Sequence, residues 1–140
     1  MLEALAACDG VLVFEDAVVD RIEIDRGQDA AAEQRARSDG FKIAQAAYAA
    51  QGFPGEERFH HQGGPTGYGE REWVATPNGT EVVVNNQAFA WNPSIRGGKT
   101  EDTVLLHDGV IENLTPTPEL PTIQANVEGS TYAAAGVLVK

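Results

Sequence analysis

The first 24 residues contain one short apolar run and one run in which apolar and polar residues alternate. Residues 10–14 form a continuous apolar run, and residues 18–24 alternate imperfectly between apolar and polar side chains. Both runs predict β-strands, because alternation with a period of two is typical of a half-buried strand. Residues 1–8 favour a short helical turn. The first part of the chain is therefore expected to contain a short helical turn and two strands.

The next stretch is rich in alanine and other strong helix formers. Gly40 follows a candidate N-cap, so residues 29–51 predict either one broken helix or two helices, at 29–38 and 40–51. An apolar stripe that would pack this region on a sheet is formed by Ile43, Ala46, Ala47 and Ala50. Gly52 stands where a helix would end.

After Pro54 the pattern changes to strands and turns. The strand candidates are residues 72–75, 81–84, 87–91 and 103–106, and the turn signals between them are residues 77–79, 85–86, 97–98 and 107–109. The tail from Thr115 to Ile123 is Pro-rich and extended, and residues 137–139 favour a last strand. A helix followed by an antiparallel run of strands predicts an α+β fold, and 140 residues suit a single domain.

The composition excludes several classes of function. A net charge of −11 argues against nucleic acid and against anionic membrane surfaces as partners. No apolar run approaches the roughly 20 residues of a membrane span, and the N-terminus lacks the basic region of a signal peptide, so we expect an acidic, soluble, cytoplasmic protein. A well-solvated surface explains the charge, and salt adaptation is an alternative. With Cys8 alone, no intramolecular disulfide or cysteine zinc site can form.

Three segments carry the candidate chemistry. Residues 60–72 combine two histidines, several glycines and two acids, and Asn92-Pro93 and Glu101-Asp102-Thr103 follow. Their order resembles the second half of the creatinase/prolidase/methionine aminopeptidase ("pita-bread") family over residues 41–140, whereas residues 1–40 match weakly. The resemblance implies the C-terminal half of a pita-bread domain, with a helix packed on a curved, mostly antiparallel sheet.

The family's metal ligands are replaced in this chain. The resemblance implies a two-metal site whose bridging hydroxide attacks an amide. Here Gly64 stands at the position of the ligand histidine, Asn92 replaces the glutamate of a Glu-Pro pair, and Glu101 keeps its carboxylate. His60 falls on the first histidine of the pattern. Because glycine and an amide make poor ligands for Mn, Zn or Co, we expect no metal and no other cofactor.

The two histidines and Glu101 are the candidate catalytic residues. His60 or His61 could transfer a proton, since imidazole titrates near neutral pH. Neighbours on a strand point to opposite faces, so one of them could serve a site while the other is structural. The alternative is a hydrogen-bonded pair that holds the glycine loop. Glu101 could act as a base or pair with Arg71 across the sheet.

The candidate substrate-binding residues are Gly64, Tyr68, Arg71, Glu72 and Asn92. By the resemblance, Arg71 takes the place of a substrate-facing histidine and Glu72 that of the acid beside it. Arg71 could clamp a substrate carboxylate, or form a salt bridge with Glu72. Asn92 could donate to a carbonyl or simply make an Asn-Pro turn, and Gly64 could let the loop pass under a substrate or make a tight turn.

The resemblance implies a peptidase-like hydrolase. We expect it to act on an amide or C–N bond of a small amino-acid-like molecule or dipeptide, without the usual two-metal site. The alternative is a catalytically inactive pita-bread binding module, or a truncated fragment. Half of a pseudo-symmetric domain would leave one sheet face exposed, so a homodimer is also expected. A clean monomer in sedimentation would count against it.

Overall fold

The computed structural model describes residues 30–108, 110–127 and 130–136. Within these ranges, helix α3 (Ala30–Ala50) and the 3-10 helix η1 (Glu56–Arg58) precede all of the strands. The strands are β1 (Gly63–Gly67), β2 (Glu70–Arg71), β3 (Gln87–Trp91), β4 (Ser94–Ile95), β5 (Gly98–Lys99), β6 (Asp102–His107), β7 (Val110–Asn113), β8 (Thr122–Val127) and β9 (Ser130–Ala135). The predicted turn at 1–8 and the predicted strands at 10–14, 18–24 and 137–139 lie outside the described residues.

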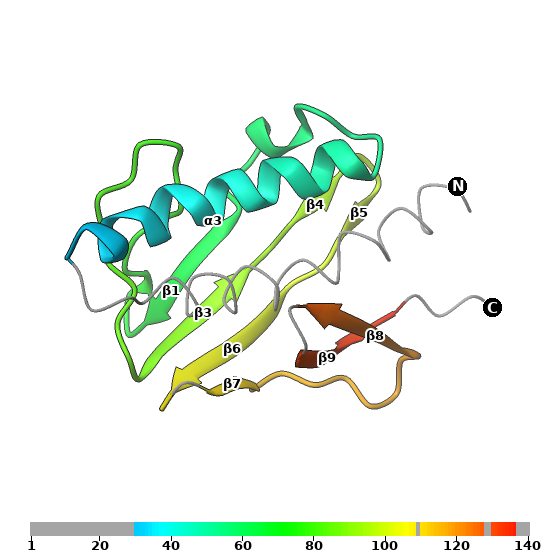
Figure 1. Cartoon of the computed structure of the whole chain (residues 1–140). Helices are drawn as coiled ribbons and strands as arrows, with labels where there is room; N and C mark the ends of the chain where they lie inside the picture. The colour runs from blue at the N-terminus through cyan, green and yellow to red at the C-terminus, as the bar shows by residue number, and fades with distance from the viewer. Residues whose placement is uncertain (1–29, 109, 128–129, 137–140) are drawn as a thin grey trace.

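Five of the strands form one antiparallel sheet in the order β2-β1-β3-β6-β7, and α3 lies along it (Figure 1). β4 pairs with β5, and β8 pairs with β9, as separate two-stranded units. The predicted α+β class is therefore confirmed. No helix among the described residues is long and apolar enough to cross a membrane.

Helix α3 is continuous, so the predicted interruption at Gly40 is wrong. A glycine inside a helix costs only about 1 kcal/mol relative to alanine, which packing readily offsets. The helix ends as predicted, because Gly52 adopts a left-handed φ of 86°. Phe53 N bonds to Tyr48 O and Gly52 N bonds to Ala49 O, the hydrogen-bond pair of a Schellman motif.

The predicted apolar stripe of α3 is right in part, because Ile43 and Ala47 pack against the core. Ala44 and Tyr48 are fully buried, and Gly40 one turn earlier is buried too. Ala46 and Ala50, which were assigned to the stripe, are exposed. Positions four apart share a helix face, and the small residues on this one allow a close approach to the sheet. The burial of Tyr48 was not predicted, because tyrosine carries a polar hydroxyl on a large apolar ring and was not counted as an apolar position.

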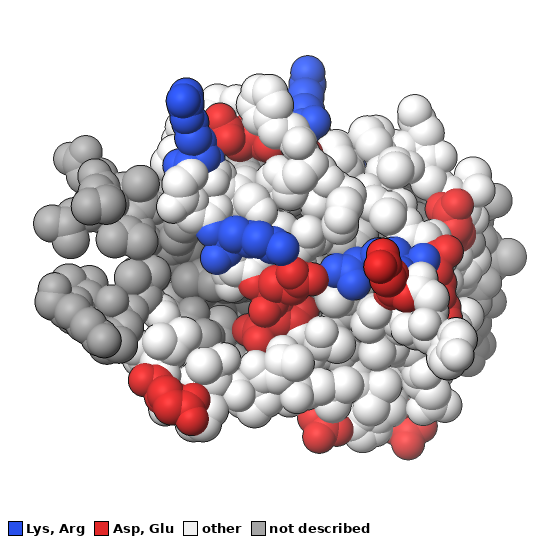
Figure 2. Space-filling model, turned by 180° about the vertical axis from the view of Figure 1, so that it is seen from behind, with Lys and Arg blue, Asp and Glu red and all other residues white. Residues whose placement is uncertain are grey.

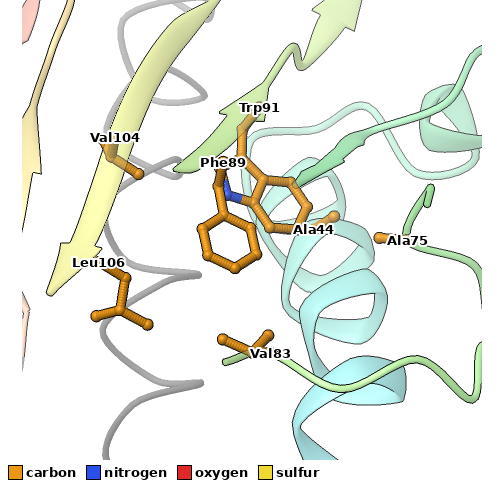
Figure 3. Close-up of a cluster of buried hydrophobic side chains, with 7 residues drawn as sticks. All are labelled: Ala44, Ala75, Val83, Phe89, Trp91, Val104 and Leu106. Atoms are coloured by element: carbon orange, nitrogen blue, oxygen red, sulfur yellow. The ribbon is translucent and has the colours of Figure 1, made fainter. Parts of the chain in front are cut away.

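The main core lies between α3 and the sheet (Figure 3). The Phe89 and Trp91 rings of β3 stack with an interplanar angle of 6°, and Ala44 of the helix packs on the same cluster. Val104 and Leu106 of β6 complete it beside β3 and are fully buried. Each large apolar side chain removed from water contributes about 1.5–3 kcal/mol, so this layer fixes the helix on the sheet.

Two of the four strand predictions after Pro54 are confirmed. Residues 87–91 and 103–106 lie in β3 and β6. Residues 72–75 and 81–84 are not strands. The first of these runs still lies along β1, since Glu72 N bonds to Pro65 O and Ala75 N bonds to Gly63 O.

The pattern missed the seven other strands, β1, β2, β4, β5, β7, β8 and β9. β1 is a Gly-Gly-Pro-Thr-Gly sequence, which reads as a turn because glycine and proline are depleted in strands. Its pairing with β3 on one side and β2 on the other decides its conformation.

Tyr48 connects α3 to the first residue of β4. Its hydroxyl donates to Ser94 O at 2.9 Å and accepts from Ser94 N at 2.7 Å. Tyr48→Phe should lower the free energy of unfolding in urea by about 1–3 kcal/mol, because both Ser94 backbone groups lose their partner. Tyr68→Phe is the control, since the Tyr68 side chain is fully exposed, and it should cost less than about 0.5 kcal/mol. Equal losses would contradict the role of Tyr48.

Candidate functional site

A polar hollow of about 290 Å³ gathers residues from separate segments of the chain. Its lining residues are His61, Glu70, Arg71, Asn92, Lys99 and Glu101. Four of them were predicted from the sequence, namely His61, Arg71, Asn92 and Glu101. β1 and its neighbouring strands bring them together, because β1 pairs with β2 on one edge and with β3 on the other.

The arginine of the hollow lies on the sheet face away from α3. Phe89 points into the core beside Ala44 of the helix, so the preceding residue, Ala88, points to the opposite face. Ala88 pairs with Thr66, and Thr66 pairs with Arg71. Directly paired residues share a face, so Arg71 projects away from the helix.

Glu101 is held between two cations. Arg71 Nη2 donates to Glu101 Oε1 and Lys99 Nζ donates to Glu101 Oε2, both at 2.8 Å. The Lys99 ammonium and then Arg71 lower the pKa of the Glu101 carboxyl, although partial burial acts in the opposite direction. The predicted Arg71–Glu101 pairing is therefore confirmed, and the alternative Arg71–Glu72 salt bridge is wrong. Seen from behind, the molecule likewise shows basic side chains next to acidic ones (Figure 2).

Two atoms of the lining residues are buried without a hydrogen-bond partner, Asn92 Oδ1 and Arg71 Nε. The Asn92 side chain is only 7% exposed. Its backbone, in contrast, is bonded, since Asn92 N donates to Gln62 O at 3.0 Å. Buried polar atoms are normally paired, so these two call for a chemical explanation.

The two histidines face different surroundings, as alternation along an extended chain predicts. His61 is exposed and lines the polar hollow. His60 Nε2 lies 3.4 Å from the Tyr48 hydroxyl and 3.2 Å from Gln62 Nε2, and burial lowers its pKa. His60 borders a second hollow of about 420 Å³, lined also by Glu56, Phe59, Ser94, Ile95 and Arg96. The structure thus separates the two candidates and leaves His61 with Arg71 and Asn92.

Three other predicted residues are absent from the lining of the polar hollow. Tyr68 is fully exposed. Glu72 accepts a hydrogen bond from Gln87 Nε2 at 3.1 Å. Gly64 serves chain packing, because a Cβ there would collide with the Trp73 carbonyl oxygen.

Glu70 and Lys99 line the hollow and were not predicted. Glu70 adopts a positive φ of 63° between β1 and β2, a conformation that no local pattern indicates for glutamate. Lys99 carries a usable signal. It is one of few lysines in an acidic chain and stands two positions before Glu101, a spacing that places both on one side of an extended segment.

The residues present do not fit the two metal ions that the pita-bread resemblance implies. Both oxygens of Glu101 are engaged by cationic nitrogens, which would repel a divalent ion. Gly64 has no ligand atom, and Asn92 contributes no charge. In the part of the chain that the structure describes, no three His, Cys, Asp or Glu residues are grouped as a metal site.

Comparison with known proteins gives no match to a family model, a curated protein or a solved structure. The function of the hollow must therefore be argued from its own residues.

The close approach at Gly64 can be tested by substitution. Gly64→Ala should lower the free energy of unfolding by about 1–3 kcal/mol or more, because its Cβ would meet backbone and not a flexible side chain. Gly69→Ala is the matched control, since a Cβ at Gly69 meets nothing within 4 Å. Urea denaturation measures both variants. A stable Gly64→Ala protein would show that the space is not required.

The ion cluster should make stability depend on pH. A carboxyl whose pKa is lower in the folded chain stabilises the fold above its unfolded pKa, and this contribution disappears as the pH falls through the folded pKa. Wild type should therefore be more stable than Glu101→Gln near neutral pH. The difference in free energy of unfolding should shrink in acid. A difference that is constant across the acid range would contradict the prediction.

Proposed function

We propose that this chain is the C-terminal half of a pita-bread-type domain and that its polar hollow is the site of a peptidase-like hydrolase. One observation carries the proposal. His61, Arg71, Asn92 and Glu101 were selected from three separate sequence segments, and all four line the same hollow. The order of a helix followed by an antiparallel sheet is compatible with such a domain.

The hollow suits a small ligand. Its volume of about 290 Å³ is near the lower end of the roughly 300–1,000 Å³ of small-molecule pockets. Its lining carries hydrogen-bonding and charged groups. A small amino-acid-like molecule or a dipeptide matches both the size and the polarity.

In the proposed reaction, His61 transfers the proton. A water molecule would lose a proton to the neutral imidazole as its oxygen attacks the substrate carbonyl carbon. The imidazolium would return that proton to the departing nitrogen as the C–N bond breaks. Arg71 and Asn92 would hold the substrate, and Glu101 would position Arg71. Because the lining does not fit a metal pair, no step depends on one.

A second candidate function is binding without turnover. The specific observation is that Glu101 is bonded to Arg71 and Lys99. Among the described residues, no hydrogen bond or ion pair joins a carboxylate to His61. A catalytic imidazole is usually oriented by such a partner.

Turnover and binding can be separated with one panel of compounds: amino-acid amides, Xaa-Pro dipeptides and guanidino compounds. We expect release of the amine product from at least one compound, measured by chromatography. His61→Gln should lower the rate by about 100-fold or more, because general acid–base catalysis contributes about that much, and should leave binding in place.

His107→Gln is the control, since His107 pairs with Glu112 and is absent from the lining of the hollow. It should retain the wild-type rate. Thermal shifts without product would favour the binding function. Neither shift nor product with any compound would overturn the proposed function.

A further inference from the structure

We infer that a third hollow, at the start of β6, binds a small organic cation: a primary ammonium group on a short apolar chain, paired with the carboxylate of Asp102. This Asp102 hollow has a volume of about 230 Å³. Its lining comes from β6, the end of β7, the Pro-rich segment before β8, and the β8–β9 hairpin. It shares no lining residue with the polar hollow, so the inference does not depend on the proposed hydrolase.

The neighbouring acids Glu101 and Asp102 serve different hollows. Burial alternates along β6, and Asp102 is buried on the same face as Val104 and Leu106. Glu101, one position earlier, lines the polar hollow and is engaged by its two cations. The polar hollow therefore uses only the first acid of the Glu-Asp-Thr segment and leaves the second for another role.

Asp102 keeps one carboxylate oxygen without a partner. The residue is only 8% exposed, and its Oδ1 accepts from Thr115 Oγ1 at 2.9 Å. Its Oδ2 makes no hydrogen bond among the described residues, yet it is not one of the fully occluded polar atoms, so a ligand in the hollow can reach it. In the part of the chain that the structure describes, Asp102 has no ion pair either. Because a carboxylate removed from water without a cation is costly, Asp102 calls for a cationic partner.

The polar side chains of the Asp102 hollow are held in place by Thr115. The Thr115 hydroxyl donates to Asp102 Oδ1 and accepts from Thr103 N at 2.9 Å. The Thr115 backbone N–H donates to Asn113 Oδ1 at 2.8 Å, and Asn113 also lines the hollow. A ligand therefore meets groups that are already ordered, which reduces the entropic cost of binding.

The rest of the lining sets the class of the ligand. Asp102 is the one charged side chain among the described lining residues, so the hollow carries a net negative charge. The net charge of −11 on the whole chain also favours cations over anions. Pro116, Pro118 and Ala134 supply apolar contacts for a short carbon chain. The volume is below the roughly 300–1,000 Å³ of ordinary small-molecule pockets, so the ligand must be small.

A divalent metal ion fits this hollow less well. Mg²⁺ and Ca²⁺ need at least six oxygen ligands, several of them usually charged. The described lining offers one carboxylate, and no three His, Cys, Asp or Glu residues are grouped in the part of the chain that the structure describes. An ammonium group, in contrast, is matched by a single carboxylate through charge-assisted hydrogen bonds.

The test compares propylammonium with 1-propanol, which have nearly the same shape and differ in charge near neutral pH. Binding is followed by proton–nitrogen NMR on the backbone signals of Thr122 and Ala134, which line the Asp102 hollow and not the polar hollow. We expect propylammonium to shift these signals and to bind at least about tenfold more tightly than propanol, because only the ammonium neutralises Asp102. Equal or tighter binding of propanol, or no shift with propylammonium, would overturn the inference.

Asp102→Asn tests the carboxylate. We expect this variant to fold, because asparagine keeps an Oδ1 acceptor for Thr115. It should lose the preference for propylammonium, since the charge is gone. Asp108→Asn, in an exposed turn, is the matched control and should keep the preference. If Asp102→Asn folds and still prefers the ammonium, the role of Asp102 is wrong. If it does not fold, the wild-type comparison of the two ligands decides alone.

Magnesium chloride tests the inorganic alternative. We expect Mg²⁺ not to displace propylammonium at equal concentration, because one carboxylate gives it too few ligands. Displacement of propylammonium by a lower concentration of Mg²⁺ would overturn the assignment to an organic cation. Hydrolysis by the polar hollow is measured separately, so failure of either proposal leaves the other standing.

Discussion

The site depends on how closely β1 lies between its neighbours. A Cβ at Gly63 would collide with the Ala90 carbonyl oxygen on one side, and a Cβ at Gly64 would collide with the Trp73 carbonyl oxygen on the other. Only residues without side chains permit this packing. β1 pairs with β2, which carries Arg71, and with β3, which Asn92 follows, and both residues line the same hollow. A side chain at Gly63 or Gly64 would therefore disturb the strand that lies between these two residues.

Charge balance gives this hollow a chemistry different from that of a metal centre. Glu101 keeps a carboxylate where the pita-bread resemblance implies a metal ligand, but Arg71 and Lys99 now supply the positive charge around it. The cations are fixed to the chain and are largely neutralised, so they add little net field. The lining keeps hydrogen-bonding side chains, among them His61 and Asn92.

Helix α3 supports the site from the other side of the sheet. Tyr48, buried at its C-terminal end, holds both backbone groups of Ser94. Ser94 is two residues beyond Asn92 and begins β4, whose partner β5 carries Lys99. Tyr48 thereby fixes the position of Ser94, and with it the segment between Asn92 and Lys99, two residues that line the hollow. His60 takes part in the same network, whereas His61 lines the polar hollow.

The sequence alone determined the α+β class, the stop of α3 at Gly52 and strands β3 and β6, because these depend on local propensity and on periodic burial. It also selected four residues of the hollow by the order of their segments. Only the tertiary structure decided that Gly40 stays helical, that the glycine-rich β1 is a strand, and that Lys99 and Glu70 join the site. These outcomes depend on contacts between segments far apart in the chain, which override local preference and leave no periodic signal.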